Sequence, residues 1–157
     1  MKRGIYRLTR GWREEEYFGD RLHEFVRALD GLMLLAKGQG EAEFVSRVTS
    51  FAKGKRIDDI AREIYRLRSF NEHLSDWPSE LAYVKETDRD RLLSERSFQA
   101  ELIAGAAYRS VLADPILRES FRRDIDISAF WASETGHPLD GAADLDAFSA
   151  VYQFREW

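Results

Sequence analysis

Arg68 and His73 are the two residues of this chain whose types and spacing best fit a catalytic site. They lie at the end of a helical pattern, within the sequence Ile-Tyr-Arg-Leu-Arg-Ser-Phe-Asn-Glu-His-Leu at positions 64–74. A guanidinium keeps its positive charge at ordinary pH, whereas an imidazole gains and loses a proton near neutrality. Together they supply what RNA cleavage without a metal ion requires, namely charge stabilisation at a phosphate and general acid–base catalysis.

The spacing of this pair sets a geometric condition. Five residues at 100° each place the two side chains about 140° apart around a straight helix. They meet only if the helix distorts near Asn71 or if a second copy of the chain supplies the partner group. Ser69, Asn71 and Glu72 lie between them as candidate supporting residues, and Glu72 either orients His73 or faces solvent. The alternative without chemistry is a helix end where Arg68 interacts with the helix dipole and His73 packs under the following loop.

The elements that must position this pair are helical. Apolar residues recur along the chain at steps of three and four, the pattern of a helix with one buried stripe. The predicted main helices cover residues 14–36, 41–52, 57–73 and 90–112. Glycines in the sequence Lys-Gly-Gln-Gly at 37–40 are expected to stop the first of them. The predicted fold class is all-α, a four-helix bundle with short extra C-terminal helices.

Shorter elements follow the main helices. Pro115 fits the first turn of a helix to about residue 123, and Asp126 is a candidate cap for another. Residues 76–88 are predicted to form a loop that begins near a Trp-Pro pair, because the residue before a proline disfavours the helical conformation. Residues 151–154 are expected to form a short strand or an extended packing segment.

The 157 residues are long enough to bury one core and predict a single domain. Its expected parts are a bundle core at about 14–131, a basic N-terminal arm at 1–13 and an acidic tail at 132–157. The chain has no cysteine, which excludes disulfides and thiolate metal sites and fits a reducing compartment. No apolar run approaches the length of a membrane span, and the N-terminus lacks the apolar core of a signal peptide. We expect a cytoplasmic protein that needs no metal or cofactor and does not bind membranes.

The charge of the chain is uneven. A net charge of −4 argues against a constitutive, high-affinity nucleic-acid binder, which carries a strong basic excess. Residues 1–13 nevertheless hold five basic groups and no acid, and residues 124–157 hold seven acids and one base. A basic end leaves room for a local anion site, and the alternative is a solvated arm and a solvated tail.

The stretch at positions 64–69, followed by His73, resembles the Tyr-x-Leu-Arg-Ser-x-x-x-His signature of HEPN domains, particularly their Apea-like branch. The similarity covers about residues 20–131. It includes segments 23–35 and 44–51, which resemble the helices before the motif, and segments 98–115 and 121–131, which resemble the helix after it and its aromatic continuation.

This resemblance implies a four-helix bundle that forms a homodimer, with the motif arginine and histidine of both copies lining a shared cleft. It also implies a metal-independent endoribonuclease of the kind found in toxin–antitoxin, anti-phage and CRISPR systems. Arg68 would hold the scissile phosphate, His73 would act as general base or acid, and the product would be a 2′,3′-cyclic phosphate. RNA and an antitoxin protein are the implied partners. Two departures from the commoner motif are Ser69 directly after the arginine, as in the Apea-like branch, and Leu74 after the histidine.

Other residues offer weaker candidates for chemistry. The pair His23-Glu24 does not continue into a zinc-protease motif, because Arg27 stands where the second histidine would be. The pair Asp58-Asp59 is expected to begin a helix, and residues 134–137 have Glu-x-x-His spacing but lie in a predicted turn. Three polar residues of the fourth predicted helix are possible supports for the motif or form surface salt bridges: Arg96, Gln99 and Glu101. Four tryptophans either stack on bases or pack in the core or an interface: Trp12, Trp77, Trp131 and Trp157.

Two further functions remain open from the sequence. One is a catalytically silent helical module that dimerises or docks another protein. The other is a nucleotide binder of the antitoxin or sensor type, which uses Arg68 and nearby arginines only to hold phosphates.

Overall fold

The computed structural model describes residues 1–13, 17–35, 40–73, 81–133 and 139–152, except for the side chains of residues 69–73 and 152. Its helices are α1 (Lys2–Arg13), α2 (Phe18–Met33), α3 (Gly40–Val48), α4 (Ile57–His73), α5 (Glu86–Ala113), α6 (Pro115–Ser120), α7 (Asp124–Ser133) and α8 (Leu145–Tyr152). Two short strands complete it, β1 (Ala52–Lys53) and β2 (Ala143–Asp144). The mostly helical class is therefore confirmed. No helix within the described ranges is both long and apolar enough to cross a membrane.

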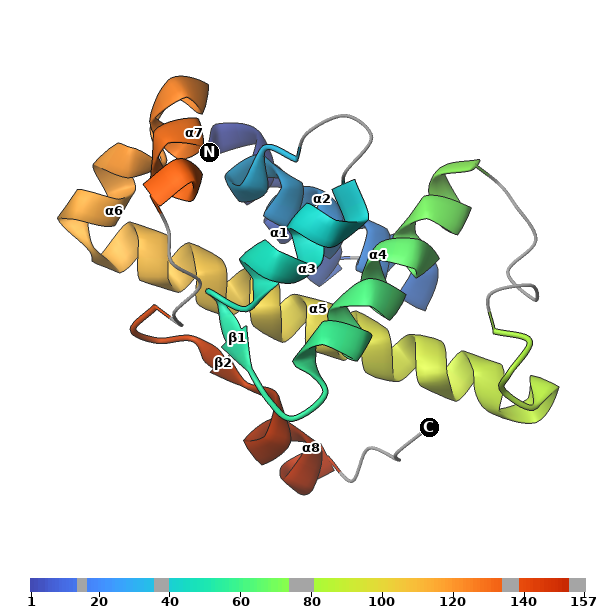
Figure 1. Ribbon diagram of the computed structural model, residues 1–157. Coiled ribbons are helices and arrows are strands. Elements are labelled where there is room, and N and C mark those ends of the chain that lie inside the picture. Colours follow the sequence, from blue (N-terminus) through green and yellow to red (C-terminus); the bar gives the residue numbers. More distant parts are fainter. Residues whose placement is uncertain (14–16, 36–39, 74–80, 134–138, 153–157) are drawn as a thin grey trace.

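The long helix α5 spans the molecule, with the N-terminal helices above it and α8 below it in the view of Figure 1. Its strongest contacts are with α2, which lies between α1 and α4 in the packing. The buried face of α5 is rich in small residues, among them Ala100, Ala104 and Ala107, which let α2 approach closely. Leucine and phenylalanine side chains of α2 fill the space between them, and burial of each such side chain contributes about 1.5–3 kcal/mol.

The basic segment 1–13 is not an arm, because it forms helix α1 and packs along α2. Its buried positions are Gly4, Leu8 and Gly11, one stripe of small and apolar residues. A Cβ atom at Gly4 would lie 1.7 Å from Tyr108 Oη, and one at Gly11 would lie 2.7 Å from the Phe25 ring. The two glycines therefore permit an approach that no larger residue allows.

Helix α2 ends earlier than the sequence predicts, at Met33 rather than near residue 36. Leu34 adopts a left-handed conformation with φ of 48°, a position where glycine is more common. Arg47 of α3 donates hydrogen bonds to the main-chain oxygens of Met33 and Leu34. Trp131 Nε1 of α7 donates to the oxygen of Leu32 at 2.8 Å. Side chains from two other helices thus satisfy the last carbonyl groups of α2.

The C-terminal segment contradicts the predicted extended structure at 151–154, because Val151 and Tyr152 belong to helix α8. Residues 153 and 154 lie outside the described part of the chain. Asp144 starts this helix, since its Oδ1 accepts a hydrogen bond from the Ala147 amide at 2.9 Å. The strand before it, β2, pairs in parallel with β1 over only two residues on each side, a small sheet that the sequence did not predict.

The predicted boundaries of α4 are confirmed at both ends, from Ile57 to His73. Asp114 caps α6 by accepting hydrogen bonds from two amides of its first turn, so Pro115 occupies the position predicted for it. Other boundaries differ. Helix α3 ends at Val48 rather than residue 52, because the chain continues into β1, and α5 begins four residues before the predicted residue 90.

Candidate functional site

Arg68 lies in the last two turns of α4, on the side that faces α2. Its Nη1 donates a hydrogen bond to Asp30 Oδ2 at 3.0 Å, and only 11% of the arginine side chain is exposed. The guanidinium carbon also lies 5.0 Å from the ring centre of Tyr65, one turn earlier on the same helix. An ion pair and a cation–π contact therefore hold the guanidinium in one place.

Asp30 is the part of this site that the sequence did not identify. It lies near the end of α2 with 19% of its side chain exposed, and Arg27 Nη1 approaches the same oxygen at 3.6 Å. In the sequence Asp30 looks like any charged residue on the polar side of an amphipathic helix. Its role follows from the packing of α2 against α4, which no local pattern shows.

The remaining predicted site residues follow Arg68 in α4. Ser69, Asn71, Glu72 and His73 all belong to the helix, which continues without a break to His73. Their side chains lie outside the described part of the structure. Arg68 is therefore the predicted catalytic residue whose side chain the structure describes, and its contacts include Asp30 and Tyr65.

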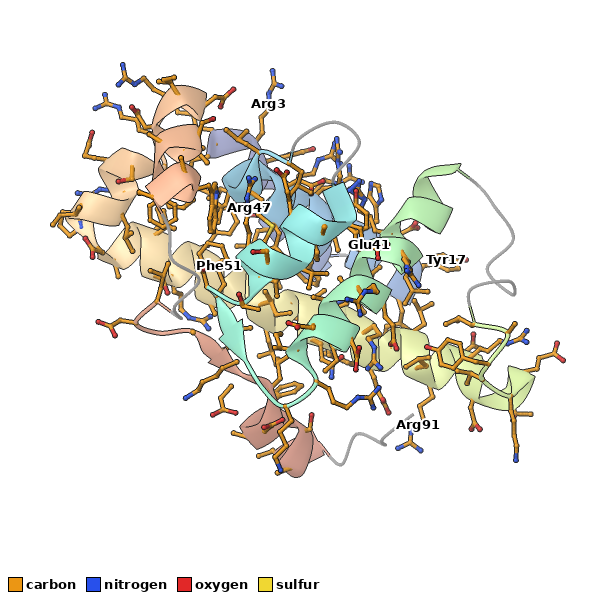
Figure 2. The ribbon with its side chains drawn as sticks, in the orientation of Figure 1. Arg3, Tyr17, Glu41, Arg47, Phe51 and Arg91 are labelled. Carbon is orange, nitrogen blue, oxygen red and sulfur yellow. The ribbon has the colours of Figure 1, made fainter. Side chains whose placement is uncertain are left out.

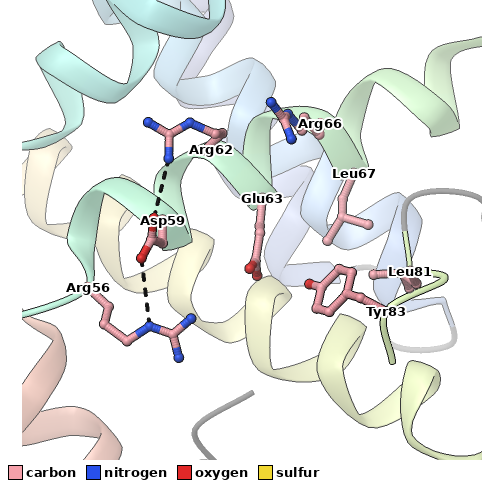
Figure 3. A pocket seen from close by; sticks show the side chains of 8 residues that line it. All are labelled: Arg56, Asp59, Arg62, Glu63, Arg66, Leu67, Leu81 and Tyr83. Carbon is pink, nitrogen blue, oxygen red and sulfur yellow. Dashed lines mark hydrogen bonds and ion pairs between the residues drawn. The ribbon is translucent and has the colours of Figure 1, made fainter. Parts of the chain in front are cut away.

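A pocket of about 190 Å³ opens beside α4, on its exposed face (Figure 3). Three arginines line it with two carboxylates, a leucine pair and a tyrosine: Arg56, Arg62, Arg66, Asp59, Glu63, Leu67, Leu81 and Tyr83. Asp59 lies between two of the arginines, 3.3 Å from Arg62 Nη1 and 3.9 Å from Arg56 Nε (Figure 3). The pocket therefore carries both signs of charge rather than one strong positive field.

Glu41 of α3 neutralises the other side of this arginine row. Its carboxylate accepts two hydrogen bonds from Arg66, at 2.9 and 3.1 Å, and lies 3.5 Å from Arg62. An open groove of about 770 Å³ between α3 and α4 borders Glu41 and Arg62. Arg62 and Arg66 therefore help to join α3 to α4 through Glu41.

Glu63 of α4 and Arg96 of α5 form an ion pair in which the arginine is buried and the glutamate is partly exposed. Arg96 Nε donates to Glu63 Oε2 at 2.6 Å, Arg96 Nη1 donates to Gln99 Oε1 at 2.9 Å, and the arginine is 3% exposed. Partial burial, followed by the negative charge of Glu63, raises the pKa of the nearby Tyr83 to about 12. One of the two roles predicted for Arg96 and Gln99 was surface salt bridging. That prediction is wrong, because both side chains are buried.

The third polar residue expected near the motif, Glu101, pairs with Arg21 of α2 instead. The guanidinium of Arg21 also lies 4.7 Å from the ring centre of Phe98. These contacts tie α2 to α5 and do not reach Arg68.

Among the residues that the structure describes, no group of three or more histidine, aspartate or glutamate side chains is arranged to hold a metal ion. Asp59 of the Asp58-Asp59 pair contacts arginines, in agreement with a charged helix start. The Glu-x-x-His sequence at 134–137 lies outside the described residues, as do Trp77 and Trp157.

Comparisons of this chain with protein-family models, with curated proteins and with solved structures find no match. What the protein does must therefore follow from its own residues and their geometry.

Proposed function

We propose that this chain is a HEPN-like, metal-independent endoribonuclease of the toxin or defence type, which cuts RNA at a cleft shared by two copies of the chain. The observation that carries the proposal is the fixed position of Arg68. Its guanidinium is held by Asp30 and Tyr65, on the helix that ends at His73. A cation that needs no reorganisation when the substrate binds is what stabilises charge in a transition state.

The bundle of this proposal consists of α2, α3, α4 and α5. Helix α2 packs on both α4 and α5, and α3 packs on α4, so the motif helix has neighbours on two sides. The motif lies in the last two turns of α4, where a second copy can approach.

Arg68 and His73 divide the chemistry between them. Arg68 has five N–H donors, so a phosphate can share the guanidinium with Asp30. His73 takes the proton of the ribose 2′-hydroxyl, whose oxygen attacks phosphorus and forms the 2′,3′-cyclic phosphate. The bond to the 5′-oxygen breaks, and that oxygen leaves with a proton taken from water. Ser69, Asn71 and Glu72 support the two residues in this scheme.

The unbroken helix favours a shared site. A straight helix keeps positions 68 and 73 about 140° apart. Helix α4 extends from Ile57 to His73, whereas a single-chain site would need this helix to distort near Asn71. The arginine of one copy and the histidine of the other are therefore the pair that we expect to act on one phosphate.

The direct test is cleavage of a labelled RNA in the presence of EDTA, with the mass of the particle measured in the same preparation. We expect wild-type protein to cut, and Arg68→Ala and His73→Ala to lose the activity while they remain dimeric. Arg66→Ala is the matched control, since Arg66 lies on the same helix but pairs with Glu41 on the surface. Retained cutting in either active-site variant would remove that residue from the proposal.

Growth gives a second readout of the same proposal. Expression of an active ribonuclease toxin arrests cells, and the His73→Ala variant does not. Co-expression of a neutralising antitoxin would restore growth.

A second candidate function is a catalytically inactive helical module that dimerises, docks a partner protein or binds a nucleotide. The observation that favours it is the same ion pair, because Asp30 already balances the charge of Arg68 within the fold. A well-folded dimer that leaves RNA intact would favour this module over the nuclease.

A further inference from the structure

Helix α1 carries an exposed basic surface with an aromatic ring at its centre. Lys2, Arg3, Arg10 and Arg13 are all exposed, and so is Tyr6, at 62%. We call these five residues the basic face of α1. Arg3 points away from the body of the protein (Figure 2).

Helical geometry gathers these five residues on one side. Lys2 and Arg3 precede Tyr6 by four and three residues, so they are its neighbours one turn earlier. Arg10 follows it by four residues and Arg13 by seven, one and two turns later. At 100° per residue, all five fall within an arc of about 100° around the helix. The tyrosine ring is therefore surrounded by cationic side chains.

The opposite side of α1 is already occupied. Gly4, Leu8 and Gly11 pack against α2, and the buried Glu24 of α2 accepts hydrogen bonds from Arg7 at 2.9 and 3.1 Å. Arg10 Nη1 also lies 3.3 Å from Glu24, at the border of the basic face. The apolar stripe that would enter a lipid bilayer is thus used inside the fold, which disfavours a membrane as the partner.

The basic face carries positive charge at several neighbouring positions, which favours binding of a polyanion. Segment 1–13 contains no acidic residue, and Glu24 of α2 pairs with Arg7 and Arg10. Three glutamates follow this segment in the sequence, at positions 14–16. Trp12, which is 50% exposed, and Ile5 border the face on one side.

We infer that the basic face of α1 binds single-stranded RNA at a second surface, separate from Arg68 and His73. The four cationic side chains contact backbone phosphates, and a base stacks on Tyr6, the combination by which proteins hold single strands without reading sequence. The choice of RNA rests on the proposed function, whereas binding at α1 does not depend on cleavage. Helix α1 and Arg68 both contact α2, so this one helix connects the basic face with the motif arginine.

The test measures binding without cleavage. The probe is a fluorescently labelled single-stranded RNA of about 12 nucleotides, and its anisotropy is followed at several salt concentrations in a His73→Ala background. The charge variant is Lys2→Gln, Arg3→Gln and Arg13→Gln together. Its matched control removes three exposed charges elsewhere, through Lys55→Gln, Lys85→Gln and Arg118→Gln. Tyr6→Leu removes the ring, and Tyr6→Phe keeps it.

The charge variant is expected to lower the slope of log affinity against log salt by about 2, since each phosphate contact contributes about 0.7 for a single strand. The control triple is expected to leave this slope nearly unchanged. Tyr6→Leu is expected to weaken binding roughly tenfold, and Tyr6→Phe to retain most of it. With active protein, the same charge variant is expected to raise KM and to leave kcat unchanged.

Three results would overturn the inference: no RNA binding by the folded protein, equal losses in the two triple variants, or binding to vesicles of phosphatidylcholine and phosphatidylserine that replaces binding to RNA. RNA binding that depends on α1, in a wild-type protein that never cuts, would support this inference and refute the proposed nuclease.

Discussion

Arg68 Nη1 lies 3.0 Å from Asp30 Oδ2, in an ion pair that joins α4 to α2 and leaves little of either side chain exposed. The pair holds the motif arginine from a helix that contains no part of the motif. Asp30 therefore has a positioning role in the proposed site, and the stability of the fold and the activity of the site are coupled through it.

Substitution of Asp30 tests this coupling. Asp30→Asn keeps the shape of the side chain but removes its charge, and we expect the free energy of unfolding to fall by about 1–2 kcal/mol. Urea denaturation measures the change. Asp59→Asn is the control, since Asp59 contacts arginines on the exposed face of α4 and its loss is expected to cost less than about 0.5 kcal/mol. Equal costs at the two positions would show that the pair with Arg68 contributes no more than a surface contact.

Substitution in the ion pair between Arg96 and Glu63 is expected to lower stability more than Asp30→Asn does, because Arg96 is almost fully buried. Glu63→Ala leaves that cation without its carboxylate, and we expect a loss of about 3 kcal/mol by urea denaturation. The double substitution Glu63→Leu and Arg96→Met replaces the pair by apolar groups and is expected to be more stable than Glu63→Ala alone. Glu41→Ala, which removes the surface partner of Arg66, is expected to cost less than about 1 kcal/mol. A double variant less stable than Glu63→Ala would contradict this account.

Helix α4 was predictable because its pattern is local. Ile60, Ala61, Ile64 and Leu67 recur at helical spacing, and all four are buried. Helix α1 could not be predicted from such a pattern, because only one of its buried residues, Leu8, is strongly apolar. The other two are glycines, which disfavour helices when nothing packs against them. The two glycines are needed because the side chains of Tyr108 and Phe25, from other helices, lie directly against them.

The candidate site divides in the same way. Arg68 and His73 stand out by residue type and spacing, so the sequence identifies them. Asp30 and the buried state of Arg96 depend on which helix faces are brought together, and a charged residue on an amphipathic helix has the same appearance whether it meets solvent or another helix. The pairing of β1 with β2 joins residues about 90 positions apart through two residues of each strand, too short a pattern to predict.

The glycines of α1 make a prediction whose sign depends on packing. Alanine is a better helix former than glycine by about 1 kcal/mol, so propensity alone predicts that Gly4→Ala stabilises the protein. The Cβ atom would lie 1.7 Å from Tyr108 Oη and 3.0 Å from the main-chain oxygen of Ala28, so we expect a loss of about 2 kcal/mol or more. Thermal unfolding measures the difference.

Gly105 provides the matched control for this substitution. It lies in α5, and a Cβ atom there would meet only the end of the Arg109 side chain, at 3.1 Å, which can move aside. Gly105→Ala is therefore expected to stabilise the protein by about 0.5–1 kcal/mol. Tyr108→Phe removes the nearest atom from the Gly4 site and is expected to reduce the cost of Gly4→Ala without abolishing it, since Cζ would remain at 2.9 Å. Stabilisation by Gly4→Ala would show that α1 packs less closely than described.

Tyr108 also predicts how stability responds to alkaline pH. Burial raises the pKa of its phenol above the ordinary value of 10, and its hydroxyl donates to the oxygen of Ala28 at 2.9 Å. Because the folded protein holds this proton more tightly than the unfolded chain, the contribution is fully present below pH 10. It is lost as the pH rises toward the folded pKa, by about 1.4 kcal/mol per pH unit for one proton.

Urea denaturation between pH 8 and pH 11 distinguishes this tyrosine from the others. Tyr108→Phe is expected to lower stability by about 1 kcal/mol at pH 8, through loss of the hydrogen bond, and to flatten the decline above pH 10. Tyr6→Phe is the control, since Tyr6 is exposed and its removal is expected to leave both the stability at pH 8 and the slope unchanged. Tyr83, whose pKa is raised to about 12, adds a smaller decline because it remains largely exposed. An equally steep decline in Tyr108→Phe would mean that the buried phenol is not the group whose ionisation limits stability at high pH.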